Sequence, residues 1–406
     1  MTTTTATPPR ATPSTARHAG GFWLVALAFL TAMAFSTVPT PLYPLYMASE
    51  GFSTFMVTVV FAAYAVGVVL SLLLAGHVSD WVGRKRILLP ALALELAAAV
   101  LFLTSTSLPT LLTARVVTGL GVGMIAATAT AYLHDLHAQH RPGASAQRFE
   151  AVSTAANIGG LGVGPLVAGV LAQYVDAPLR TPYLVFAVLL ALAIAAVALS
   201  PETVATPEVR PAYRPQRVSA THGDRAGYVA AAAAGFASFA VFGLFTSVAP
   251  GFVAGALHHP SRALAGLVVF AVFGGAAAAQ TLTSRMSTSR KRTFGLLAQA
   301  VGVLVLVAGM HLESLSAFLL GGVVAGIGAS VLFKAAVGTI AATAAPAERG
   351  QALAGLFLIA YLGLSLPAVG IGIATLSTTA TSAMTWFAGV LLVLLSGVAA
   401  LSRRSR

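Results

Sequence analysis

The chain has 406 residues, of which 57% are hydrophobic and only 8% are charged, and it carries a net charge of +12 without a single cysteine. About a quarter of the residues of a soluble domain are charged, so this composition excludes a soluble globular protein and indicates a surface that faces lipid. The lack of cysteine excludes disulfides, a thiol nucleophile and a cysteine metal site, and no other pattern in the sequence completes a metal or cofactor site.

The first 20 residues differ in composition from the rest of the chain. They are rich in Thr, Pro and Ala, which is typical of disordered segments, so we expect a disordered tail at 1–20. The apolar run that follows resembles the core of a signal peptide. However, no cleavage site followed by a soluble domain appears, and we interpret the run as an uncleaved first span.

Twelve segments are long and apolar enough to cross a bilayer, which takes about 20 residues of helix. The sequence therefore predicts an all-α membrane protein with twelve transmembrane helices. The predicted spans are residues 22–46, 54–76, 87–106, 109–133, 150–173, 182–200, 227–250, 263–284, 294–311, 315–338, 350–376 and 382–401.

The cations lie mainly in alternate connectors between these spans. If both termini are cytoplasmic, nineteen Lys and Arg residues lie on that face and only Arg180 and Arg262 on the other. The positive-inside rule then predicts a multi-pass protein of the cell membrane, of the bacterial inner-membrane type, with both termini in the cytoplasm. Cations placed in short loops between apolar runs also argue against a nucleic-acid partner.

A proline-containing connector divides the chain into two halves with six spans each. The halves show weak internal repeats: VVTGLG at Val116–Gly121 corresponds to VVAGIG at Val323–Gly328, roughly 200 residues later. Duplicated halves are common among transporters. The expected organisation is an N-terminal bundle at 21–200, a cytoplasmic linker at 201–225, a C-terminal bundle at 226–402 and a cytoplasmic tail at 403–406.

The connector between spans two and three, GHVSDWVGRKR, concentrates charge between two apolar runs. It is similar to the G-x-x-x-D-x-x-G-R-K/R signature of the major facilitator superfamily, with Gly76, Asp80, Gly83, Arg84 and Lys85 at its positions. The resemblance covers essentially the whole chain and implies two pseudo-symmetric six-helix bundles. It also implies that Asp80 helps to latch the two halves together on the cytoplasmic side. The alternative is that the motif only fixes topology.

Span five contains a second motif, GLGVGPLVAG, which resembles the G-x-x-x-G-P-x-x-G-G motif of the same superfamily. Gly160, Gly164, Pro165 and Gly169 occupy its positions, while Ala168 replaces one glycine. The motif is typical of exporters and antiporters, so the resemblance favours efflux and the drug:proton antiporter branch. Helix bending at Pro165 and ordinary packing of small residues are the two physical readings of the motif.

Three ionisable residues fall inside predicted spans, where such groups are functional hypotheses by default. Arg115 lies in a span-four motif, LLTARVVTG, that the family also shows, and the resemblance implies a role in proton transfer or in organising the cavity. Glu95 lies near the middle of span three and is a second candidate for proton coupling. A neutral Glu95 bonded to a neighbouring helix is an equal alternative.

Five residues are candidates for a substrate cavity: Arg115, Lys334, Tyr43, Asn157 and Tyr361. Lys334 is too deep in span ten for its stem to reach the interface comfortably, so we expect it to face the cavity or a partner. Two cations without a facing acid predict an electropositive cavity that favours anionic substrates. The alternative is that Lys334 pairs with helix-end carbonyls. Four phenylalanines of span seven cannot all face one side, so at most part of that set lines a cavity.

These observations predict a secondary active transporter that works by alternating access, most simply proton-coupled efflux of a small organic molecule. The alternatives are an uptake symporter for a sugar or organic acid and a non-transporting sensor. No phosphate-binding loop for ATP is present, and no set of catalytic groups at common depth suggests an enzyme. The expected partners are a small-molecule substrate, protons as the coupling ion and the lipid bilayer, and the chain is expected to act as a monomer.

Overall fold

The computed structural model describes residues 14–75, 78–204, 213, 215–216, 225–345 and 348–404. Several sequence-based expectations lie outside this part: residues 1–13 of the predicted tail, Gly76 of the connector motif, most of the predicted linker and the last two residues.

In the described part, regular structure is entirely helical, and twelve helices or helix pairs are long and apolar enough to cross a membrane, as predicted. Proline or a change of helix type interrupts spans one, five and seven. The helices are α1 (Ser14–Ser36), η1 (Thr40–Leu42) and α2 (Tyr43–Glu50), α3 (Thr54–Ala75), α4 (Ser79–Val82), α5 (Arg84–Thr104), α6 (Leu108–His140), α7 (Gln147–Thr154), η2 (Ala155–Gly159) and α8 (Gly160–Tyr174), α9 (Thr181–Leu199), α10 (Arg225–Ser247) and α11 (Ala249–Gly255), α12 (Arg262–Leu282), α13 (Thr288–His311), α14 (Leu315–Thr343), α15 (Arg349–Ala374) and α16 (Ala380–Arg404).

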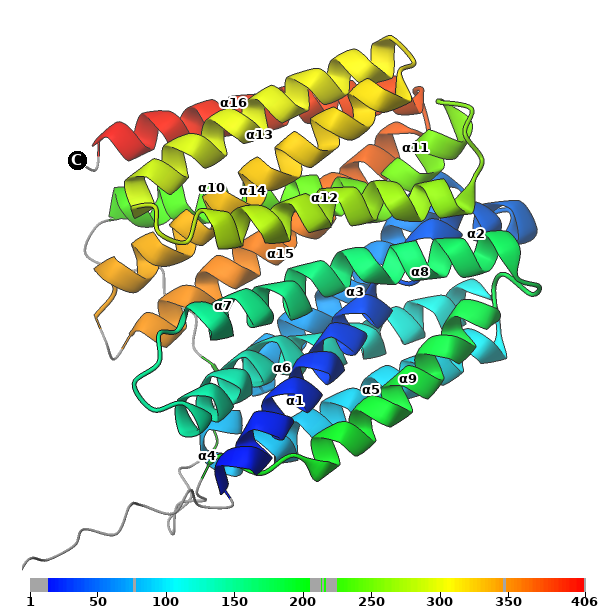
Figure 1. Cartoon of the computed structure of the whole chain (residues 1–406). Helices are drawn as coiled ribbons and strands as arrows, with labels where there is room; N and C mark the ends of the chain where they lie inside the picture. Colours follow the sequence, from blue (N-terminus) through cyan, green and yellow to red (C-terminus); the bar gives the residue numbers. More distant parts are fainter. Residues whose placement is uncertain are drawn as a thin grey trace, which may run out of the picture.

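The helices form two bundles that meet along their length (Figure 1). One hydrophobic core is built almost entirely from α1 to α9, and a second core is built from α10 to α16. The halves touch where α8 packs on α12 and where α3 packs on α15. This is the two-bundle arrangement expected from the sequence.

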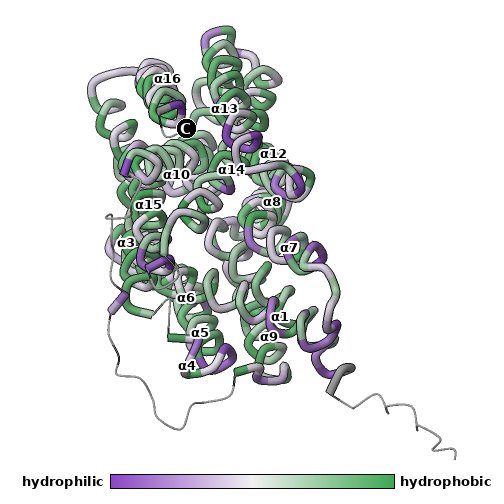
Figure 2. Tube along the Cα trace, turned by 90° about the vertical axis from the view of Figure 1, so that its left-hand side faces the viewer, coloured by the Kyte–Doolittle hydropathy of each residue, from purple (hydrophilic) through white to green (hydrophobic). Residues whose placement is uncertain are grey.

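The chain begins and ends at the same end of the bundle, which we call the terminal face; the other end is the opposite face. Figure 2 looks onto the terminal face and shows hydrophobic residues along the helices, with hydrophilic residues gathered near their ends. The bundle therefore presents an apolar belt of the kind that fits a bilayer.

Span one is broken rather than continuous. The α1 helix ends at Ser36, and the next helical segments, η1 and α2, begin at Thr40 and at Tyr43, with Pro39 just before η1 and Pro41 inside it. Proline has no N–H for the helical ladder and clashes with the preceding turn, so two prolines within three residues account for the break. The break leaves the main-chain oxygen of Ser36 free to accept a bond from outside the helix.

Glycines set the closest helix contacts of the first half. A β-carbon on Gly67 in α3 or on Gly119 in α6 would collide with the main chain of the other helix. In a bilayer the hydrophobic effect does not drive helices together, so their association depends on close packing, which small residues allow. The α3–α6 contact therefore depends on these two positions.

Candidate functional site

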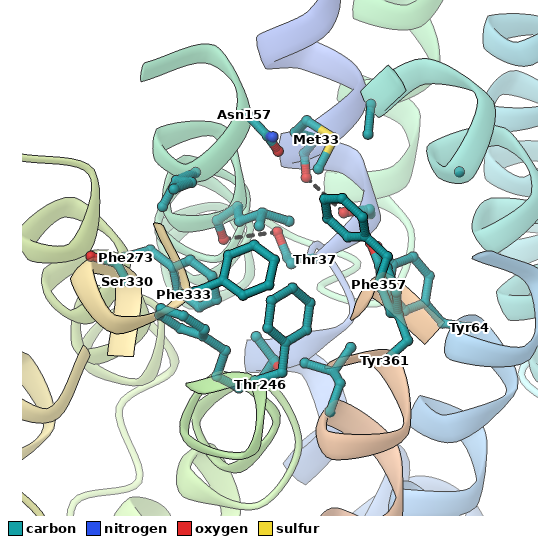
Figure 3. Close-up of a pocket in the computed structure, with 18 of the residues that line it drawn as sticks. Met33, Thr37, Tyr64, Asn157, Thr246, Phe273, Ser330, Phe333, Phe357 and Tyr361 are labelled. Carbon is teal, nitrogen blue, oxygen red and sulfur yellow. Dashed lines mark hydrogen bonds between the residues drawn. The ribbon is translucent and has the colours of Figure 1, made fainter. Parts of the chain in front are cut away.

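A cavity of about 460 Å³ lies between the two halves. Its wall combines residues of α1, α3, α6, η2 and α8 with residues of α10, α12, α14 and α15. Figure 3 shows Thr37, Tyr64 and Asn157 of the first half and Phe333 and Tyr361 of the second half around the same space. A volume of this size suits a drug-sized small molecule.

The cavity reaches toward the terminal face. Leu72 and Gln280 line it within three residues of the ends of α3 and α12 on that side. Toward the opposite face the halves are joined, because the Thr40 hydroxyl donates a hydrogen bond of 3.1 Å to the Thr246 main-chain oxygen. The structure is therefore a state with access from the terminal face and closure at the other.

Arg115 is the only charged residue among the described residues that line the cavity. Its side chain is 2% exposed, and its Nη1 donates a hydrogen bond of 2.7 Å to the Ser36 main-chain oxygen at the break of span one. The guanidinium carbon lies 4.5 Å from the centre of the Tyr64 ring, a cation–π distance. The Arg115 Nε makes no hydrogen bond in the described part of the chain.

The second half supplies an apolar, aromatic wall. Neighbouring rings lie 4.9 to 6.5 Å apart, within the range of favourable aromatic pairs. We call this set the aromatic track; its members are Phe273, Phe242, Phe239, Tyr361, Phe333 and Phe357. Phe239 and Phe242 are the cavity-lining part of the span-seven phenylalanine set, whereas Phe245 packs against Phe318.

The polar groups on the second-half wall are engaged within their own half. Thr246 donates to the Phe242 main-chain oxygen, Ser330 donates to the Ala276 main-chain oxygen, and Gln280 donates to the Ser330 main-chain oxygen. These bonds leave the aromatic rings as the dominant surface that the second half offers to a ligand.

Three of the five predicted cavity residues line the cavity: Arg115, Asn157 and Tyr361. Asn157 belongs to the π-helical turn Ala155–Gly159, a helix type that is rare and frequent at functional sites. Sequence periodicity gave no signal for this turn.

Tyr43 and Lys334 are not part of the cavity wall. Tyr43 lies beyond the break in span one, toward the opposite face, and is 3% exposed. The Lys334 ammonium donates a hydrogen bond of 3.3 Å to the Gln280 main-chain oxygen near the end of α12. Free carbonyls at a helix C-terminus favour a cation, so Lys334 takes the helix-end alternative that the sequence left open.

Glu95 is fully buried and packs over Gly121 of α6. Neither of its carboxyl oxygens makes a hydrogen bond in the described part of the chain, and it interacts electrostatically with Arg115. Glu95 does not line the cavity, because α6 lies between Glu95 and the cavity. Gly123 of α6 faces the cavity instead.

The connector motif joins α4 and α5 to their neighbours in the first half. Arg84 pairs with Asp80 and also donates to the Asp135 carboxylate at 3.1 Å. The Glu202 carboxylate accepts hydrogen bonds from the main-chain N–H groups of Arg84 and Lys85 at 3.0 and 3.1 Å. Asp80 does not form the expected latch between the halves here, because its ion pair with Arg84 stays within the first half.

Gly83 has a structural reason to be glycine. Its φ of +117° is strained for other residues, and a β-carbon there would lie 2.7 Å from the Glu202 carboxylate. The Lys85 ammonium donates to the main-chain oxygens of Ala198 and Ser200 at the end of α9. The motif thus fixes how α4 and α5 meet α6 and α9.

The span-five motif packs α8 in two directions. A β-carbon on Gly160 or Gly164 would meet α1, and one on Gly169 would meet the Arg262 main chain of α12 in the other half. Gly266 of α12 likewise lies against the Pro165 main chain. The small residues of the span-five motif therefore form part of the contact that joins the halves.

A sequence model described as Major Facilitator Superfamily matches residues 24–255, more than half of the chain. No curated protein sequence matches the chain.

Solved transporter structures share the fold over nearly the whole chain. The human organic anion transporter MFSD10 (TETRAN) matches with a TM-score of 0.70 and 17% identity, covering 97% of this chain and 100% of that one. A variant of the nucleoside transporter NupG matches with a TM-score of 0.71 and 13% identity, covering 94% and 99%. A POT family transporter in complex with 5-aminolevulinic acid matches with a TM-score of 0.74 and 12% identity, covering 95% and 96%. At these identities the likeness shows the fold alone.

Proposed function

The chain belongs to the Major Facilitator Superfamily of secondary transporters, and on that premise we propose that it exports a small organic anion in exchange for protons by alternating access. The observation that supports this most is the cavity between the halves, which has one buried cation and access from one face. The superfamily is not one of enzymes, and no catalytic chemistry is proposed.

The charge of the cavity supports an anionic substrate. Arg115 is the only charged wall residue in the described part, and its Nε makes no hydrogen bond there. A guanidinium binds carboxylates through two parallel hydrogen bonds, which adds both affinity and geometry. The human organic anion transporter with the same fold is consistent with this proposal, which rests on the cavity itself.

Efflux is the proposed direction because the span-five motif resembles that of exporters and antiporters. The motif residues lie where α8 meets α1 and α12. We propose the cell membrane as the site of action, with both termini in the cytoplasm and a single chain as the working unit. The terminal face is then the cytoplasmic face, from which an exporter loads its substrate.

A second candidate is cotransport of the anion with a proton, and the Glu95–Arg115 interaction favours it. An ionised Glu95 would attract Arg115 and weaken its hold on a substrate anion. Protonation of Glu95 would remove that competition, so proton and anion would each strengthen the binding of the other. Positive coupling of this sign suits cotransport, whereas exchange requires the two to compete.

Transport by purified protein in proteoliposomes tests both candidates with a panel of radiolabelled organic acids, neutral drugs and amines. Exchange predicts uptake of an organic acid when the vesicle interior is acidic, and cotransport predicts uptake when the exterior is acidic. Collapse of the gradient by an ionophore should abolish either signal. No gradient-driven movement of any compound under either condition would contradict both candidates.

A further inference from the structure

The two halves offer different chemistry to the cavity. The first half presents the Arg115 guanidinium, whose Nε makes no hydrogen bond in the described part, and the Asn157 side chain, while its Ser36 and Thr37 hydroxyls donate to main-chain oxygens of the same half. The second half presents the aromatic track, with its own polar groups bonded to its own main chain. A ligand that satisfies both walls must itself have two different ends.

The two surfaces meet at a pair of tyrosines. Tyr64 lies under the Arg115 guanidinium, 4.5 Å from ring centre to guanidinium carbon, and its phenol interacts with that of Tyr361. Tyr361 is a member of the aromatic track, with its ring 5.4 Å from that of Phe239. The cation and the start of the track are therefore neighbours across the junction of the halves, and Figure 3 shows Tyr64 and Tyr361 on the same side of the cavity.

We propose that the substrate is an aromatic carboxylate that lies across this junction, with its carboxylate against Arg115 and its ring against the aromatic track. This rests on the transport function proposed above and adds the class and orientation of the substrate.

The anion end of the substrate is determined by the donors that Arg115 has left. One Nη1 bond goes to Ser36, which fixes the guanidinium plane, and Nε makes no hydrogen bond in the described part. A buried donor without a partner is energetically unfavourable; Nε has almost no exposed surface here, so a carboxylate oxygen would satisfy it as the guanidinium turns toward the cavity. No Asp or Glu lies on the described wall to compete for that place.

The ring end of the substrate is determined by the second half. Six rings in continuous contact form a surface that favours stacked or edge-to-face contacts with another ring. Saturated rings bury the same area without those contacts. Lipophilic cations would also find aromatic faces attractive, but the buried Arg115 charge opposes them.

Binding to full-length protein in lipid nanodiscs tests the proposal with four matched probes, measured by isothermal titration calorimetry at pH 7. The first probe is 1-naphthylacetate. The others are its neutral amide, 1-naphthylacetamide, the cation 1-naphthylmethylammonium and the non-aromatic anion cyclohexylacetate. We expect 1-naphthylacetate to bind at least tenfold more tightly than each of the other three.

Variants locate the two ends of the ligand. Phe239→Leu and Phe333→Leu should each reduce the preference for 1-naphthylacetate over cyclohexylacetate by at least threefold, while cyclohexylacetate affinity stays within twofold. Arg115→Gln should equalise binding of 1-naphthylacetate and its amide. Phe294→Leu is the matched control, because Phe294 is 41% exposed on the outside of α13, and it should change none of these ratios.

Equal affinity for the acid and the amide would overturn the proposal, as would preference for the cation or no saturable binding of 1-naphthylacetate at millimolar concentration. If Arg115→Gln does not fold, the ratio of acid to amide in the wild type decides the charge argument. Binding as expected without gradient-driven transport in proteoliposomes would support this assignment and reject the transport proposal. Gradient-driven transport of the acid and the amide at equal rates would support the transport proposal and reject this assignment.

Discussion

The Arg115 guanidinium donates a hydrogen bond of 2.7 Å to the main-chain oxygen of Ser36, at the residue where α1 ends. This bond joins span four to the break in span one, and the same guanidinium stacks on Tyr64 of α3. One side chain therefore fixes three helices of the first half while it faces the cavity.

Replacement of Arg115 by lysine should separate charge from geometry. Lysine keeps the positive charge but lacks the planar fork that donates to Ser36 and stacks on Tyr64 together. We expect transport to fall at least tenfold and stability to fall by about 1.5–3 kcal/mol, the value of a hydrogen bond to a charged group. Transport in proteoliposomes and thermal unfolding in detergent measure the two effects. Arg180→Lys, at an exposed position, is the control, and equal behaviour of the two variants would show that only charge matters.

Removal of the Asp80 charge should disturb the connector motif. Asp80→Asn breaks the ion pair with Arg84, which also bonds Asp135. The Asp80 side chain is 66% exposed, so the stability effect should be below about 1 kcal/mol, whereas the proposed latch predicts transport reduced at least fivefold at normal expression. Asp176→Asn in an exposed connector is the control. Normal transport by Asp80→Asn would leave the motif with a role in topology alone.

Glu95→Gln tests proton coupling at the buried carboxyl. The amide keeps the shape and removes the titratable group, in a site where neither carboxyl oxygen makes a hydrogen bond in the described part. If Glu95 carries the proton, uphill transport should be lost while exchange of substrate down its gradient persists. The control is Glu50→Gln, because Glu50 is an exposed acid bonded to Thr106. Uphill transport by Glu95→Gln with unaltered pH dependence would make Glu95 structural.

The α3–α6 contact should not tolerate a methyl group. Gly119→Ala places a β-carbon against the Tyr64 main-chain oxygen and the Gly67 α-carbon, and overpacking of this kind costs about 1–3 kcal/mol. A lower thermal midpoint in detergent is the expected result. Gly389→Ala in α16, where the added carbon meets open space, should leave the midpoint unchanged. A midpoint for Gly119→Ala equal to that control would mean that the helices separate without cost.

The proposed topology is open to cysteine labelling, because the chain has no cysteine of its own. Ser145 lies in the exposed α6–α7 connector at the terminal face, and Ser377 lies in the exposed α15–α16 connector at the opposite face. A membrane-impermeant maleimide added to intact cells should label Ser377→Cys and leave Ser145→Cys unlabelled until the cells are broken. The reverse pattern would place the termini outside the cell.

The number and order of the spans could be predicted because a span is a run of consecutive apolar residues, which the sequence shows directly. The ends of the spans were less well defined. The α6 helix continues to His140, beyond the predicted end at residue 133. Its last two turns lie outside the apolar belt, so the hydropathy of the sequence falls there although the helix continues. The break after Ser36 was also missed, although Pro39 and Pro41 were a usable signal.

The rotation of each helix about its axis is what the sequence did not determine. Lipid and the neighbouring helices are both apolar, so Phe294 on the outside of α13 and Phe333 on the cavity wall occupy similar-looking runs. Polar residues were a better guide, since Arg115, Asn157 and Tyr361 were found and line the cavity. Lys334 shows the limit of that guide, because a carbonyl at the end of α12 satisfies its ammonium.

The hydrogen bond between the Thr40 hydroxyl and the Thr246 main-chain oxygen has a consequence for how fast the molecule can switch orientation. Water replaces such a bond almost fully, so breaking it changes the free energy by only about 0.5–1.5 kcal/mol. A closure of this kind can yield to thermal motion. The halves also meet where glycines bring main chains together, at Gly169 against Arg262, at Gly266 against Pro165 and at Gly372 against Phe55, and these packed contacts do not have the ready replacement that water gives a hydrogen bond. Turnover should therefore be more sensitive to the size of a side chain at those glycines than to loss of the threonine hydroxyl.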